Sequence, residues 1–121
     1  MIEERHSVMV DAIAKKGTEI LAELTPEQAE LIHMAMLITG EAGELCGAIK
    51  KHTIYQRELD GENVIEELGD LEWTLERIRQ ILCISREETL DANIDKLTVR
   101  YPNLEYSNEN AQTRADKGEG Q

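Results

Sequence analysis

Six apolar residues recur at alternating steps of four and three, and this spacing limits the fold more than any other feature of the chain. They are Val64, Leu68, Leu71, Leu75, Ile78 and Leu82. Such steps place the side chains on one stripe of an α-helix, and a stripe of this kind is typical of a seam between packed helices. Because strand-like alternation is scarce and the chain has only two prolines, the sequence predicts an all-α fold.

Capping residues mark where the expected helices begin. Thr25 and Gln28 form a capping box and Pro26 suits the first turn, so one helix should begin there and run to about residue 51. Residues 53–61 are expected to connect it to the helix that carries the apolar stripe.

Two further helices are expected on either side of these. The first covers residues 3–24, with a kink or break at Gly17. The last begins with a second capping box, formed by Ser85 and Glu88, and ends at Pro102.

The expected helices fall within residues 1–102, and 121 residues are enough for one core. We therefore expect residues 1–102 to form a single all-α domain. From residue 103 the sequence is polar and becomes rich in glycine, so residues 103–121 should form an extended or partly disordered C-terminal tail.

The chain is strongly acidic, with 25 Asp and Glu against 13 Lys and Arg and a formal net charge of −12. Such a surface repels nucleic acid polymers and anionic lipid, so neither a nucleic acid nor a membrane is an expected partner. No apolar run reaches membrane-spanning length and no signal-peptide pattern is present, so a cytoplasmic location is expected. An anionic substrate would need a bound divalent cation to bridge it to this surface. The alternative is that the acidity serves solubility alone.

Two pairs of carboxylates stand out on consecutive helices. Glu41 with Glu44, and Glu67 with Asp70, are each three residues apart and so share a helix face. Antiparallel packing of the two helices can bring all four together, although each close pair then repels by about 1 kcal/mol even at the dielectric constant of water. Hard cations would neutralise that charge, and oxygen-only ligands favour Mg²⁺, Mn²⁺ or Ca²⁺ over zinc. A solvated acidic face on each helix is the alternative interpretation.

A polar stripe on the last expected helix complements the acidic pairs. Asn93, Lys96 and Arg100 share one helix face, and an amide with two cations suits a triphosphate. Lys51 lies seven residues after Glu44 on the same stripe and is a further candidate for phosphate binding. Each of these residues alone is more typical of a solvated surface, and it is their combination with the acidic pairs that favours a polyphosphate site.

In this order the motifs resemble those of the MazG-like all-α nucleoside triphosphate pyrophosphatases, in which ExxE is followed by ExxD and later by an Asn/Lys/Arg stretch. The matching segments are residues 41–45, 66–71 and 93–102. Residues 111–116 resemble the tail of short single-domain members of that family.

The resemblance implies a four-helix-bundle-like fold that assembles as a homodimer or homotetramer. It implies Mg²⁺-dependent hydrolysis of a (deoxy)nucleoside triphosphate between the α- and β-phosphates, for nucleotide-pool control or house-cleaning. The products are the monophosphate and pyrophosphate, Mn²⁺ can substitute, and a site holds two or more ions. The metal ligands carried over by position are Glu41, Glu44, Glu67 and Asp70, and the phosphate ligands are Asn93, Lys96 and Arg100. An unbound oxygen of Glu41 or Glu44 would orient the attacking water.

Four residues that precede the first acidic pair are candidates for contact with the nucleotide base. Met34 and Leu37 continue the Glu41 stripe and can line an apolar slot, while Glu30 and His33 can form hydrogen bonds to a base. The alternative is that Met34 and Leu37 belong to the core.

Two other functions stay open from the sequence. One is a narrow-specificity member of the same family that acts on dGTP or GTP, on dUTP or on phosphoribosyl-ATP. The other is a non-catalytic helical interaction module that binds a partner through the apolar residues 31–38.

Overall fold

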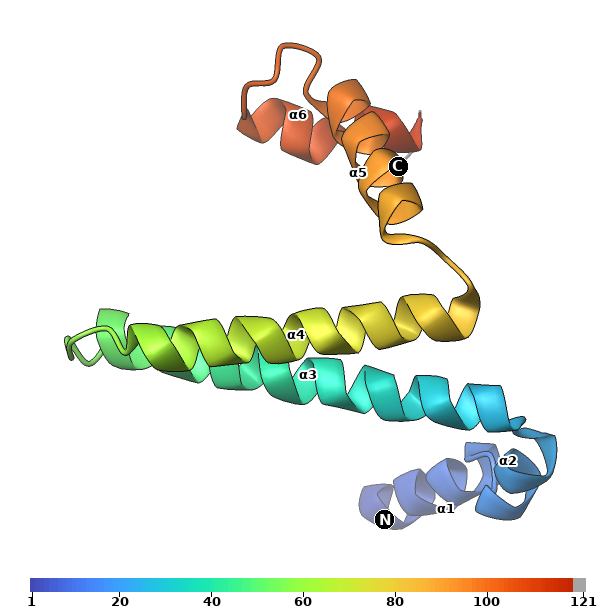
Figure 1. The fold of residues 1–121 in the computed structure, drawn as a ribbon. Helices are drawn as coiled ribbons and strands as arrows, with labels where there is room; N and C mark the ends of the chain where they lie inside the picture. The colour runs from blue at the N-terminus through green and yellow to red at the C-terminus, as the bar shows by residue number, and fades with distance from the viewer. Residues whose placement is uncertain (119–121) are drawn as a thin grey trace.

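The computed structural model describes residues 1–118, and every regular element in that range is helical (Figure 1). The elements are α1 (Ile2–Ile13), α2 (Gly17–Glu23), α3 (Pro26–Thr53), α4 (Gly61–Leu82), α5 (Arg86–Arg100), α6 (Asn108–Thr113) and the short 3₁₀ helix η1 (Ala115–Lys117). The all-α class predicted from the sequence is confirmed. Each of these helices is too short or too polar to cross a membrane.

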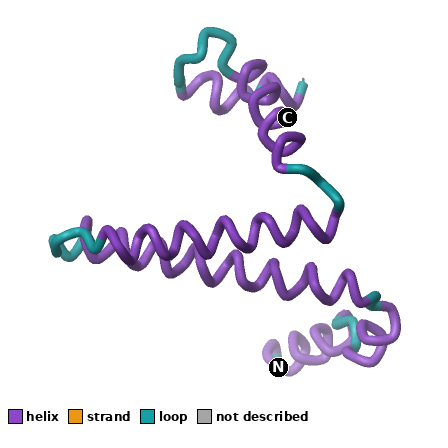
Figure 2. The backbone as a smooth tube through the Cα atoms, viewed as in Figure 1, coloured by secondary structure: helices purple, strands orange, loops and turns teal. Residues whose placement is uncertain are grey.

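The packed centre of the chain is an antiparallel hairpin of the two long helices, α3 and α4 (Figures 1 and 2). The predicted capping box begins α3, where the Gln28 amide donates to Thr25 Oγ1 at 3.1 Å and the Thr25 amide donates to Gln28 Oε1 at 3.0 Å. Asp60 caps α4 by accepting a hydrogen bond from the Asn63 amide at 3.0 Å. Since α3 ends at Thr53 and α4 begins at Gly61, the hairpin turn lies within residues 53–61, as the sequence predicted.

Side-chain burial is concentrated where the two long helices meet. The buried side chains in the described range are Met34 and Ala48 on α3 and Glu67 and Thr74 on α4. Thr74 is the most buried, at 1% exposed, and its hydroxyl donates to the Asp70 carbonyl oxygen at 2.9 Å. Two of these four buried residues, Glu67 and Thr74, are therefore polar.

The N-terminal arm is divided at residues 14–16, close to the break expected near Gly17. Gly17 is the first residue of α2, because Ala14 and Lys16 adopt extended backbone conformations that end one helix before the next begins. No residue of α1 or α2 is buried.

Helix α5 turns away from the hairpin and packs against its own C-terminal segment, α6 and η1 (Figure 1). The tail that was expected to be extended or partly disordered therefore contains two helical elements within residues 103–118. Ser107 caps α6 by accepting a hydrogen bond from the Asn110 amide at 3.0 Å, and an ion pair joins η1 to α5. Residues 119–121 lie outside the described range.

Large apolar side chains stay exposed on all parts of the chain. Examples are Met36 on α3, which is 69% exposed, and Trp73 on α4 and Ile94 on α5, which are both 60% exposed. Exposed apolar side chains in this number favour contact with another molecule, provided that they gather into a common surface.

Candidate metal centre

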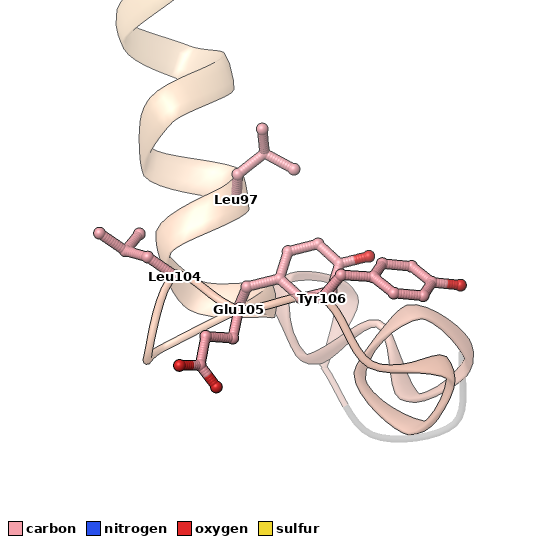
Figure 3. Close-up of a pocket in the computed structure, with 5 residues that line it drawn as sticks. Leu97, Leu104, Glu105 and Tyr106 are labelled. Carbon is pink, nitrogen blue, oxygen red and sulfur yellow. The ribbon is translucent and has the colours of Figure 1, made fainter.

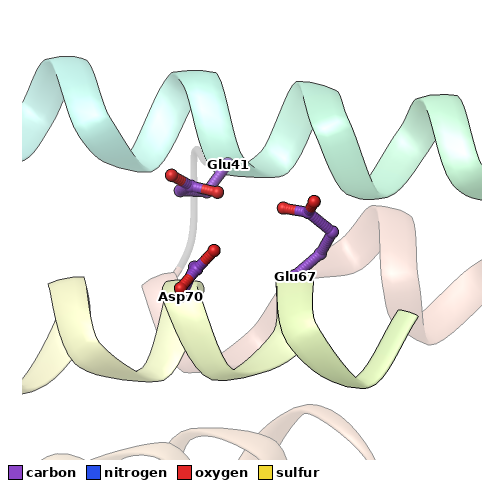
Figure 4. Close-up of side chains that lie close together, drawn as sticks. All are labelled: Glu41, Glu67 and Asp70. Carbon is purple, nitrogen blue, oxygen red and sulfur yellow. The ribbon is translucent and has the colours of Figure 1, made fainter. Parts of the chain in front are cut away.

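The α3–α4 hairpin brings together three of the four carboxylates singled out in the sequence. One carboxylate oxygen from each of Glu41, Glu67 and Asp70 lies within 4.8 Å of the other two (Figure 4). Glu41 comes from α3, and the other two are three residues apart on the facing side of α4. The i,i+3 spacing and the antiparallel packing are therefore sufficient to build the cluster.

The cluster is partly withdrawn from solvent. Glu67 is only 8% exposed and Glu41 is half-buried, whereas Asp70 is exposed. The Oε2 atoms of Glu41 and Glu67 are buried and have no hydrogen-bond partner among the described residues. Because a buried charged oxygen without a partner is costly, these two atoms call for a proton or a cation.

The pKa of Glu67 is also changed by its surroundings in this cluster. Burial, followed by its interactions with Glu44 and Glu41, raises the pKa of Glu67 from 4.5 to about 7. Glu44 is exposed and lies outside the three-oxygen cluster, but it is close enough to affect Glu67. The structure thus places the fourth predicted ligand, Glu44, beside Glu67.

The donor set fits a hard divalent cation. All donors are carboxylate oxygens, which suit Mg²⁺ or Mn²⁺ and not a soft metal. Oxygens that share one Mg²⁺ lie at most about 4.2 Å apart, because each is about 2.1 Å from the ion. The three oxygens lie within 4.8 Å of one another, so small side-chain adjustments would be enough to surround an ion.

The predicted phosphate ligands are not brought to this cluster within one chain. Asn93 and Lys96 are exposed on α5, which turns away from the hairpin (Figure 1). Lys51 is exposed near the C-terminal end of α3. Arg100 is engaged by Asp116, with Nε donating to Oδ1 at 2.8 Å and Nη2 donating to Oδ2 at 3.2 Å.

The four base-pocket candidates lie on α3 and separate into core and surface residues. Met34 is buried and Leu37 is half-buried, which agrees with a core role for Met34. His33 is exposed, and Glu30 accepts a hydrogen bond from Nη2 of Arg77 at 3.3 Å.

Asp116 is the polar partner that sequence reasoning missed. It lies 16 residues after Arg100, and its side chain is only 4% exposed. The signal in the sequence was indirect: residues 111–116 resembled a family tail, but nothing in the spacing identified which side chain the carboxylate would meet.

One comparison with known proteins gives a match that spans nearly all of the α3–α4 hairpin and α5. A family model described as the MazG nucleotide pyrophosphohydrolase domain matches residues 28–105, which is more than half of the chain. The match contains both acidic pairs and the polar stripe of α5, whereas α1, α2 and Asp116 lie outside it. No curated protein and no solved structure matches the chain.

Proposed function

Because the chain belongs to the MazG nucleotide pyrophosphohydrolase family, we propose that it hydrolyses a nucleoside or deoxynucleoside triphosphate between the α- and β-phosphates. The products are the nucleoside monophosphate and pyrophosphate, and the cell would use the reaction to control or clean its nucleotide pool. The observation that carries the proposal is the cluster of Glu41, Glu67 and Asp70, in which two buried oxygens have no hydrogen-bond partner among the described residues.

In this proposal Glu41, Glu67 and Asp70 hold Mg²⁺, with Mn²⁺ as a substitute, and Glu44 completes the ligand set. When bound, the cation neutralises phosphate charge and lowers the pKa of the attacking water. With its pKa raised to about 7, Glu67 is partly protonated near neutral pH, and it would have to lose that proton to bind the cation. An oxygen of Glu41 or Glu44 that is not a ligand accepts a hydrogen bond from the water and orients it.

The phosphate-binding half of the site comes from α5. Asn93, Lys96 and Arg100 offer an amide and two cations on one helix face, and Lys51 adds a cation near the hairpin turn. Since α5 turns away from the hairpin of its own chain, we propose that a second copy supplies this helix. The exposed apolar residues on α3, α4 and α5 support assembly as a homodimer or homotetramer.

A non-catalytic helical module explains the exposed apolar faces but not the acidic cluster. Two carboxylate oxygens that are buried without hydrogen-bond partners would lower the stability of a module that only packs against other helices. A bound cation removes that penalty, so the hydrolase is the better account of the same surface.

The proposal is tested by identifying products after incubation with Mg²⁺ or Mn²⁺. The panel includes the common (d)NTPs, with dGTP, GTP and dUTP among them, and phosphoribosyl-ATP. We expect pyrophosphate and a monophosphate from at least one substrate, and loss of turnover by more than about a hundredfold in Glu67→Gln. Glu66→Gln is the matched control, because Glu66 is the exposed neighbour of Glu67 in sequence.

Two outcomes would contradict the proposal. Absence of turnover with every nucleotide and both metals would refute the hydrolase function. Release of orthophosphate in place of pyrophosphate would refute cleavage at the α–β linkage.

A further inference from the structure

The ion pair between Arg100 and Asp116 is the best-sheltered ion pair in the described part of the chain. Its side chains are 17% and 4% exposed, whereas each other ion pair in that range includes one side chain that is more than half exposed. It joins the last residue of α5 to the middle of η1. A pair this sheltered holds a fixed geometry more firmly than a surface pair does.

The contact uses only one edge of the Arg100 guanidinium. Asp116 accepts hydrogen bonds from Nε at 2.8 Å and from Nη2 at 3.2 Å. A guanidinium has five N–H donors in a planar fork, so Asp116 leaves Nη1 and the second hydrogen of Nη2 unused, while the Tyr101 side chain also interacts with this guanidinium. One arginine can therefore hold a carboxylate and a phosphate at the same time.

The chain that carries Asp116 returns to α5 by a defined path. After α5 ends, the Tyr101 and Tyr106 rings lie 6.0 Å apart between their centroids, and they help to line a pocket with Leu97 and Leu104 (Figure 3). Ser107 then caps α6, which leads into η1. The Asp116 carboxylate is thus held in place by a folded segment, α6 and η1.

We propose that Asp116 is a positioning residue for phosphate binding, which holds the Arg100 guanidinium so that its remaining edge is presented to a phosphate of the substrate. This inference rests on the proposed function, which assigns Arg100 to the phosphates. It makes η1, which lies beyond the family match, a part of the substrate site. An arginine that is already fixed loses less conformational freedom when the phosphate binds.

Steady-state kinetics of Asp116→Asn tests the proposal in the full-length chain. Asparagine has the shape of aspartate but no charge, so we expect KM for the best Mg²⁺–nucleotide substrate to rise about tenfold while kcat changes less than threefold. Glu109→Gln is the matched control. Glu109 is exposed on α6, and this substitution changes the net charge by the same amount as Asp116→Asn. KM of this control should stay within about twofold of the parent value.

A second set of variants separates positioning from folding. Arg100→Lys keeps a charge but cannot hold two oxyanion partners in one plane, so it should raise KM similarly. Adding Asp116→Asn to Arg100→Lys should raise KM little further, because both changes remove one coupled unit. Asp116→Glu, which restores the carboxylate, should recover at least part of the loss. Fully additive effects of the two single changes would overturn the proposal.

The remaining outcomes separate this inference from the hydrolase proposal. If the parent protein turns over nucleotide and Asp116→Asn has an unchanged KM, then Asp116 only anchors the tail and the inference is wrong. A lower KM would show that Asp116 competes with phosphate, which also overturns it. If the parent turns over no nucleotide, calorimetric titration with inorganic tripolyphosphate in Mg²⁺ decides: about tenfold weaker binding by Asp116→Asn supports the inference, and equal affinity or absent binding refutes it.

Discussion

Mg²⁺ binding to the acidic cluster should release a proton, and Glu67 is the residue that should supply it. Burial and its interactions with Glu44 and Glu41 raise the pKa of Glu67 from 4.5 to about 7, so the metal-free protein retains part of this proton at neutral pH. A carboxylate must be ionised to bind a metal ion, and binding therefore displaces the proton. Glu67→Gln removes both the proton and the ligand.

The size of the effect follows from that pKa. With a value of about 7, Glu67 of the metal-free protein carries about 0.9 proton at pH 6, about 0.5 at pH 7 and about 0.1 at pH 8. Mg²⁺ binding should release these amounts. The apparent affinity should fall almost tenfold for each pH unit below pH 6 and level off above pH 8.

The same shift fixes the sign of the pH effect on the metal-free fold. Because the pKa of Glu67 is raised in the folded state, its contribution to stability is fully present below pH 4.5 and is lost as the pH rises through about 7. The melting temperature of the metal-free protein should therefore fall over that window. The stabilisation gained from a fixed Mg²⁺ concentration should grow across the same window.

Isothermal titration calorimetry in buffers of different ionisation enthalpy measures the protons released. The Glu66→Gln control, which changes an exposed neighbour, should release protons like the parent protein, whereas Glu67→Gln should bind Mg²⁺ weakly and release almost none. Mg²⁺ binding that is equally tight at pH 6 and pH 8 would refute the reasoning. So would full proton release by Glu67→Gln, because the proton would then come from another group.

Two changes in the hairpin test its energetics. Met34→Ala removes a buried side chain and should lower the free energy of unfolding by about 2–5 kcal/mol in chemical denaturation, whereas Met36→Ala at an exposed position should be milder unless that face is covered by a second copy. Thr25→Ala removes the side chain that caps α3 and should cost about 1 kcal/mol in the same assay, and an unchanged midpoint would show that the Gln28 half of the capping box is sufficient.

The features that the sequence predicted well are those set by local chemistry. Thr25 and Ser85 begin helices because each offers a side-chain oxygen to a backbone amide three residues later. The acidic cluster needed one further step, because Glu41 and Glu67 meet only when the hairpin is antiparallel. A short connection between two long apolar helices leaves few other arrangements.

The features that were missed depend on partners distant in the chain. Apolar residues of α5 such as Ile94 are exposed in the single chain, but the sequence does not say which helix or which copy would cover them. Likewise, Arg100 looked like a free cation on a polar stripe, and only the folded tail shows that Asp116 engages it. The tail was expected to be extended or partly disordered because its composition is polar. That composition did not reveal the helix cap at Ser107 or the sheltered ion pair of Asp116.

The two halves of the proposed site should respond differently to protein concentration. Glu41, Glu67 and Asp70 are gathered by one hairpin, so a single chain has what it needs to bind Mg²⁺. In the proposed assembly a second copy supplies the polar stripe of α5 to this cluster, so we expect turnover to require association. Dilution from micromolar to nanomolar chain should therefore lower the activity per chain while the Mg²⁺ affinity stays constant. Constant activity at concentrations where sedimentation shows a monomer would instead require that α5 folds back onto its own hairpin.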